Sequence, residues 1–148
     1  MLPTLNGRIQ TRIFLLVVVG GLWTLVISHA LPGIAASAGS AAIYRTTFTV
    51  LITTLVLGVG WEFVYHFLQQ FRWEKDWPTL FGLITVVNEG ALVWLLLSLG
   101  VVPGLPVGVA LSAFLVLFAT TWVLVWLAAN GPMRVPFVHW RFRGGRLL

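Results

Sequence analysis

Two glutamates, Glu62 and Glu89, each lie inside an apolar stretch that is long enough to cross a membrane. The chain of 148 residues has only four acidic residues, so this pair is half of them. A charged side chain at the centre of a membrane helix costs roughly 2.5–3.5 kcal/mol on insertion scales. Each glutamate therefore needs a partner, and the pair is the first candidate for a functional site.

Polar residues accompany each glutamate at helical spacing. Residues three and four apart share one face of a helix, which places Tyr65 and His66 beside Glu62. Asn88 is the neighbour of Glu89 in the next apolar stretch. We expect the two helices to turn these faces toward each other or toward a partner helix. The predicted intramembrane polar site contains Glu62, Tyr65, His66, Asn88 and Glu89.

Three kinds of chemistry fit this group of residues. Polar side chains bonded across a helix interface could simply hold the helices together. Alternatively, Glu62 could pair with a charged His66, while Glu89 stays protonated because burial and a second carboxylate both disfavour its charged form. Such a group is typical of the proton relays of transporters. The third hypothesis is a metal ion bound by Glu62, His66 and Glu89 through nitrogen and oxygen ligands.

Sequence motifs for catalysis are missing from the chain. It contains no cysteine, which excludes disulfides, thiol nucleophiles and zinc–thiolate sites. It has neither the His-Glu-x-x-His motif of zinc proteases nor a Walker-type loop for nucleotides. The sequence therefore favours a protein that is not an enzyme, and it identifies no cofactor.

The elements that must position the polar site are membrane helices. The chain is 59% hydrophobic and 9% charged, whereas soluble domains are about 25% charged. A bilayer core of about 30 Å needs roughly 20 apolar residues in a helix, and four stretches have this length. They predict an all-α polytopic membrane protein that forms a single integral membrane domain. Its spans are expected at about 13–31, 47–68, 80–99 and 109–128, followed by a basic tail at 130–148.

Lysine and arginine are distributed unevenly around these spans. Eight of the nine lie before the first span, in the second connection or in the tail, and only Arg45 lies on the other side. Because basic flanks stay in the cytoplasm, we expect an antiparallel four-helix bundle in the cytoplasmic (inner) membrane, with both termini inside. As an alternative, Ala36-Ser37-Ala38 could end a cleaved signal peptide, which would leave three spans in the same orientation.

Aromatic and basic residues gather on the predicted inner side. They alternate in the tail, where each arginine gains about 1 kcal/mol against an anionic leaflet. The net charge of +5 therefore indicates anionic lipid headgroups and membrane topology rather than nucleic acid. The second connection is dense in aromatic residues and mixed charges, and aromatic residues and arginine are enriched at protein interfaces. The predicted lipid or partner contacts are Arg72, Trp73, Lys75, Trp77, Trp140, Arg141 and Arg143.

One stretch resembles a known family. Residues Arg12–Thr24 are similar to the opening helix of the small four-helix GtrA-like translocases of lipid-linked sugars. The resemblance covers this helix alone, and the charged second and third spans depart from the pattern of that family. No function is therefore taken from it.

The expected function is that of a small non-enzymatic subunit or accessory of a larger membrane assembly. Its partners would be the lipid bilayer and a membrane protein, or further copies of the chain in a homo-oligomer. The alternative is a small oligomeric transporter or channel, in which the polar site carries a proton or cation. A metal-dependent membrane enzyme is the third interpretation.

Overall fold

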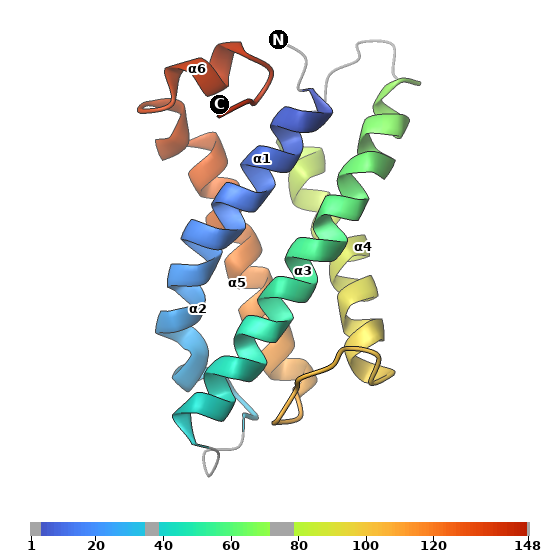
Figure 1. Ribbon diagram of the computed structural model, residues 1–148, viewed down its shortest axis with the longest axis vertical. Helices are drawn as coiled ribbons and strands as arrows, with labels where there is room; N and C mark the ends of the chain where they lie inside the picture. Colours follow the sequence, from blue (N-terminus) through green and yellow to red (C-terminus); the bar gives the residue numbers. More distant parts are fainter. Residues whose placement is uncertain (1–3, 35–38, 72–78, 148) are drawn as a thin grey trace.

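Four long apolar helices form the protein in a computed structural model, which describes residues 4–34, 39–71 and 79–147 (Figure 1). The described residues contain no β-strand. The helices long and apolar enough to cross a membrane are Leu5–Ala30, Ser40–Gln69, Phe81–Ser98 and Leu111–Arg134. The structure thus confirms an all-helical protein with four candidate spans.

The first of these helices begins before the two N-terminal arginines. Thr4 caps it, because the Thr4 hydroxyl accepts a hydrogen bond of 3.2 Å from the backbone N–H of Gly7. Helix α1 (Leu5–Leu15) leads through a π-helical turn, η1 (Leu16–Gly20), into α2 (Gly21–Ile27) and a short 3₁₀ turn, η2 (Ser28–Ala30). The sequence predicts a span that starts near residue 13, after Arg8 and Arg12. In the structure both arginines lie inside α1 instead.

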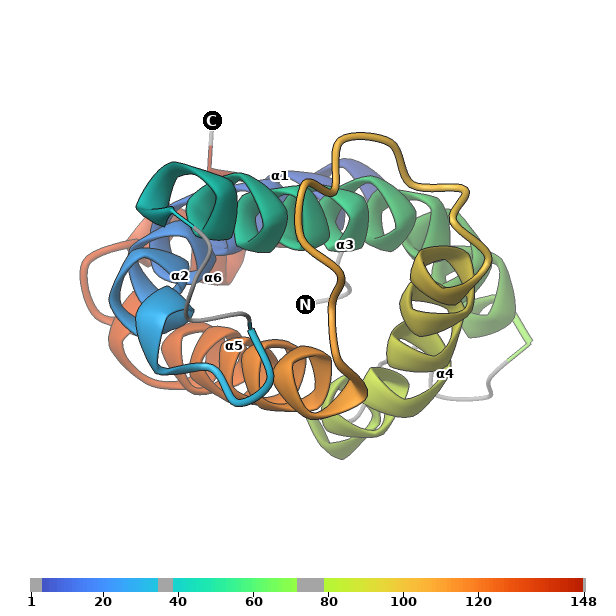
Figure 2. The same cartoon turned by 90° about the horizontal axis from the view of Figure 1, so that it is seen from below.

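The next three helices overlap their predicted spans: α3 (Ser40–Gln69), α4 (Thr79–Ser98) and α5 (Leu111–Asn130). Helix α3 begins seven residues before the predicted start at residue 47. The 3₁₀ turn η3 (Pro132–Arg134) and helix α6 (Val138–Phe142) lie in the tail, where the sequence predicts no helix. Figure 1 shows the start of α1, the end of α3 and the C-terminal α6 at the same end of the molecule. Seen from below in Figure 2, α4 lies at one edge, where it packs mainly against α3 and α5.

A core of apolar and aromatic side chains joins α3, α4 and α5. Its centre is a row of rings on α5, in which Phe118 stacks between Phe114 and Trp122 at centroid distances of 5.2 and 5.6 Å. The buried members of this cluster are Leu31, Val50, Val93, Leu97, Ala113, Phe114, Leu117, Phe118 and Trp122.

Small polar residues line the contact between α2 and α3. Gly20, Thr24 and Ser28, spaced four apart, are all buried. The hydroxyls of Ser28 and Thr47 lie 2.8 Å apart and share a hydrogen bond. Small residues of this kind let membrane helices approach closely, so the start of α3 is held against the end of the first span.

The C-terminal segment folds back onto α1. Trp140 donates a hydrogen bond of 2.7 Å from its indole N–H to the hydroxyl of Thr11, and that hydroxyl donates to the Gly145 carbonyl at 3.0 Å. The backbone N–H of Thr4 donates to the Gly144 carbonyl at 2.9 Å. Gly7 allows this contact, because a Cβ atom there would overlap the Gly144 carbonyl. The tail thereby fixes the turn of α1 that carries the two arginines.

Candidate functional site

The partners of the two membrane glutamates are arginines of α1. Arg12 bonds Glu62 Oε1 through Nε at 2.7 Å. The same guanidinium bonds Glu89 through Nη1 and Nη2, at 2.7 Å to Oε2 and 3.0 Å to Oε1. Arg8 bonds the other oxygen of Glu62 through Nε at 2.6 Å. All four carboxylate oxygens therefore accept a hydrogen bond from a guanidinium.

These four side chains form a buried and electrically neutral group. Glu62 and Glu89 are 6% and 2% exposed, and the side chains of Arg8 and Arg12 are 11% and 12% exposed. A buried ion is tolerated only when it is paired and its remaining hydrogen-bonding positions are filled. Two cations and two anions, with a guanidinium bonded to every carboxylate oxygen, meet the pairing part of this condition.

Further polar side chains extend the group in two directions. The Tyr65 hydroxyl donates to Glu89 Oε1 at 3.0 Å and accepts a hydrogen bond of 2.8 Å from the Asn88 amide. At the other end, Arg8 Nη1 donates to Gln69 Oε1 at 3.2 Å. We call the seven connected side chains the arginine–glutamate network: Arg8, Arg12, Glu62, Tyr65, Gln69, Asn88 and Glu89. The network ties α1 to both α3 and α4.

Neighbouring helices hold Arg12 in place. Its guanidinium passes over Gly58 of α3, where an added Cβ would lie 2.5 Å from Nη1. On the side of α5 its Cζ atom lies 5.5 Å from the centre of the Trp122 ring, within the range of a cation–π interaction. The Trp122 indole is itself oriented by a hydrogen bond of 3.2 Å to the Gly82 carbonyl of α4. Arg12 therefore contacts all three of the other long helices.

The structure brings four of the five predicted site residues into the network, and His66 is the exception. Within the described part of the chain, no hydrogen bond or ion pair involves His66, although its Nδ1 atom is buried. The predicted carboxylate–imidazolium pair with Glu62 does not form, because Arg8 and Arg12 occupy both oxygens of that carboxylate.

The metal hypothesis finds no ligand set in the structure. Among the residues described, no group of three or more histidine, cysteine, aspartate or glutamate side chains is placed to hold a metal ion. The candidate set of Glu62, His66 and Glu89 is not assembled. The guanidinium of Arg12 lies between the two carboxylates, where a bound cation would have to lie.

The residues that sequence reasoning missed are Arg8 and Arg12, which it interprets only as markers of topology. Two features of the sequence could have identified them. Arg8 and Arg12 are four residues apart and so share one face of a helix. They also equal the two membrane glutamates in number and carry the opposite charge. A buried carboxylate is stabilised best by a cationic partner, and arginine is always charged whereas histidine is not.

The predicted lipid or partner contacts are only partly described. Arg72, Trp73, Lys75 and Trp77 lie outside the described residues, and so does the side chain of Arg141, a residue of α6. Trp140 is engaged with Thr11 of the same chain. Arg143 is exposed and follows α6 directly in the chain.

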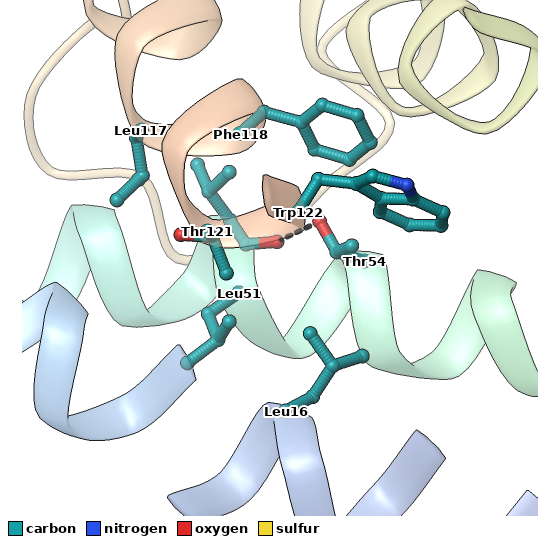
Figure 3. A pocket seen from close by; sticks show the side chains of 8 residues that line it. Leu16, Leu51, Thr54, Leu117, Phe118, Thr121 and Trp122 are labelled. Atoms are coloured by element: carbon teal, nitrogen blue, oxygen red, sulfur yellow. Dashed lines mark hydrogen bonds between the residues drawn. The ribbon is translucent and has the colours of Figure 1, made fainter. Parts of the chain in front are cut away.

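A small apolar pocket lies beside the network, between η1, α3 and α5 (Figure 3). Its lining residues are Leu16, Val50, Leu51, Thr54, Leu117, Phe118, Thr121 and Trp122. Thr54 turns its hydroxyl to the Val50 carbonyl of its own helix at 2.9 Å. Because no charged side chain lines the pocket, it offers little to a polar substrate.

Comparison with known proteins finds no relative: no family model, no curated protein and no solved structure matches the chain. The similarity of the first helix to GtrA-like translocases is therefore not accompanied by a family match. The function has to be argued from the arginine–glutamate network and from the surfaces around it.

Proposed function

We propose that the chain is a small, non-enzymatic subunit or accessory of a larger assembly in the cytoplasmic membrane. It would form an antiparallel four-helix bundle with both termini on the cytoplasmic side. One observation carries this proposal: arginines of the same chain already bond every carboxylate oxygen of Glu62 and Glu89. The charged residues of the membrane interior are thus used to hold the fold together.

A protein whose interior polar groups serve its own fold acts through its surfaces. The candidate span of α4 is 17% buried within the chain, whereas those of the other three helices are each 33% buried. Small residues and polar side chains on a membrane helix are the usual means of contact with another helix. The exposed side of α4 is therefore the candidate contact surface, either for another membrane protein or for a second copy of the chain.

A proton- or cation-handling role is the second candidate, and one observation favours it. Glu89 is connected through the Tyr65 hydroxyl to Asn88, an exposed residue of α4, by hydrogen bonds of 3.0 and 2.8 Å. In such a relay, the Tyr65 hydroxyl would pass its proton to Glu89 and take up another proton from the exposed side of α4. To accept the proton, however, Glu89 would have to give up part of its ion pair with Arg12, a cost that a relay built on a free carboxylate avoids.

Two measurements test the proposal. The first is the mass of the particles that contain this chain, extracted from native membranes into lipid nanodiscs without detergent. We expect particles in which other proteins accompany the 16.3-kDa chain in fixed ratio. Particles that contain only this chain and lipid would overturn the accessory role.

The second measurement is ion flux through the purified chain in liposomes under a pH gradient. We expect no flux above that of protein-free liposomes. A flux that Glu89→Gln abolishes, while the matched variant Gln70→Glu on the exposed end of α3 retains it, would establish the relay and overturn the proposal.

A further inference from the structure

The outer face of α4 carries a regular pattern of exposed residues. Positions separated alternately by three and four residues form one stripe along a helix, as in the contact seam of a coiled coil. On α4 every member of such a stripe is exposed. The stripe residues are Phe81, Ile84, Asn88, Ala91, Leu95 and Ser98. We call this face the α4 stripe.

Asn88 is the polar residue in the middle of the α4 stripe. Its Nδ2 group donates to the Tyr65 hydroxyl at 2.8 Å, and it has no other side-chain hydrogen bond in the part of the chain described. The carbonyl oxygen and the second N–H of the amide are therefore unused. Inside a bilayer no water satisfies such groups, so a protein partner has to supply the missing donor and acceptor.

We propose that the α4 stripe is a homodimer interface, in which Asn88 hydrogen-bonds to Asn88 of the partner subunit. An amide is both donor and acceptor, so two copies of it are complementary to each other. Copies inserted into one membrane have the same orientation, which makes the two α4 helices parallel about a twofold axis along the membrane normal. In a parallel pair each stripe residue meets its own counterpart, and the amides are thereby brought together.

Three other residues of the α4 stripe fit this arrangement. Ala91, one turn further along the stripe, is small enough to allow the close approach of two helix backbones. Ile84 and Leu95, which are 54% and 51% exposed, lie on either side of Asn88 along the stripe. In the dimer, each of them would be covered by the same residue of the partner subunit. A single asparagine in such a seam fixes the register and the two-stranded state. The dimer would also join two arginine–glutamate networks through Asn88 and Tyr65 of each copy.

The homodimer does not depend on the accessory role. A dimer that binds no other protein would support this inference and overturn the proposed function. A single copy bound to another protein would do the reverse.

Cysteine cross-linking in native membranes tests the interface, because the chain has no cysteine of its own. With Ala91→Cys, oxidation is expected to give a product of twice the 16.3-kDa mass of the chain. The controls are Val26→Cys on α2 and Val56→Cys on α3, whose native side chains are 72% and 65% exposed, and these should stay monomeric. A monomeric Ala91→Cys chain, equal cross-linking of the controls, or a product of another mass would overturn the homodimer.

Substitutions within the stripe test the role of the amide. With Leu95→Cys as the reporter, Asn88→Leu should weaken dimerisation roughly ten-fold, the usual size of an interhelical hydrogen bond in peptides. Ala91→Phe should weaken it as well without touching the Asn88–Tyr65 bond, so a loss in both variants is not explained by misfolding of the network. Undiminished cross-linking in both variants would show that the stripe is not the interface.

Discussion

Arg12 and Glu89 form a bidentate ion pair between α1 and α4. Two parallel bonds of 2.7 and 3.0 Å join Nη1 and Nη2 of the guanidinium to the two oxygens of the carboxylate. The Nε atom of the same guanidinium donates a hydrogen bond of 2.7 Å to Oε1 of Glu62 on α3. A planar guanidinium presents donors in several fixed directions, which an ammonium group cannot do. One arginine side chain therefore joins three helices.

Removing one member of this pair should destabilise the fold more than removing both. Arg12→Met leaves Glu89 buried without a cation, and we expect the free energy of unfolding to fall by about 3–5 kcal/mol. Arg12→Met combined with Glu89→Leu leaves a neutral pair of Arg8 and Glu62, so most of that loss should be recovered. Reversible unfolding in detergent micelles measures both. A double variant that loses as much unfolding free energy as Arg12→Met and Glu89→Leu lose when made separately, added together, would contradict the pairing.

Substitution of two glycines on α3 by alanine should have different effects on the stability of the protein. Gly58→Ala places a methyl group 2.5 Å from Arg12 Nη1, and the resulting shift of the guanidinium should cost about 1–3 kcal/mol of unfolding free energy. Gly60→Ala is the matched control, since nothing lies within 4 Å of its added Cβ. It should be neutral or stabilise the helix by up to about 1 kcal/mol. Equal effects on the unfolding transition would argue against the close contact at Gly58.

The two tyrosines of the chain offer a similar comparison. Tyr65→Phe removes the hydroxyl between Glu89 and Asn88, and the polar groups left behind should lower the unfolding free energy by about 1–3 kcal/mol. Tyr44→Phe removes a hydroxyl that makes an exposed bond of 3.3 Å to the Leu25 carbonyl. Its effect should stay within about 0.5 kcal/mol, as for other surface changes. Thermal unfolding of the two variants in one detergent compares them, and a larger loss for Tyr44→Phe would contradict the network.

Single cysteines should report the orientation of the bundle. Arg45→Cys and Arg143→Cys replace exposed residues. Arg45 lies near the start of α3 and Arg143 directly after α6, and Figure 1 shows these two segments at opposite ends of the molecule. With both termini in the cytoplasm, a membrane-impermeant maleimide should label Arg45→Cys on intact cells and Arg143→Cys only after permeabilisation. The reverse pattern would place the termini outside.

The existence of the four long helices follows from the sequence because its cause is local. Long apolar runs must form hydrogen-bonded helices in a bilayer, so α4 at Thr79–Ser98 lies within one residue of the predicted 80–99. The start of α1 could not be located in this way. A prediction from hydropathy stops the span before an arginine, because it counts each arginine as an uncompensated charge. In the structure, carboxylates of two other helices neutralise Arg8 and Arg12, and the helix therefore extends beyond both residues.

The sequence alone shows that Glu62 and Glu89 need partners, because the cost of a bare carboxylate in hydrocarbon depends only on the residue and its apolar surroundings. The choice of partner is a tertiary property. Arg12 lies far from both glutamates along the chain, and only the rotation and depth of three packed helices bring its guanidinium to both carboxylates. The same packing leaves His66 outside the arginine–glutamate network, although its spacing from Glu62 is that of a neighbour on one helix face. Spacing specifies which side chains can meet, and the packing of the helices decides which of them do.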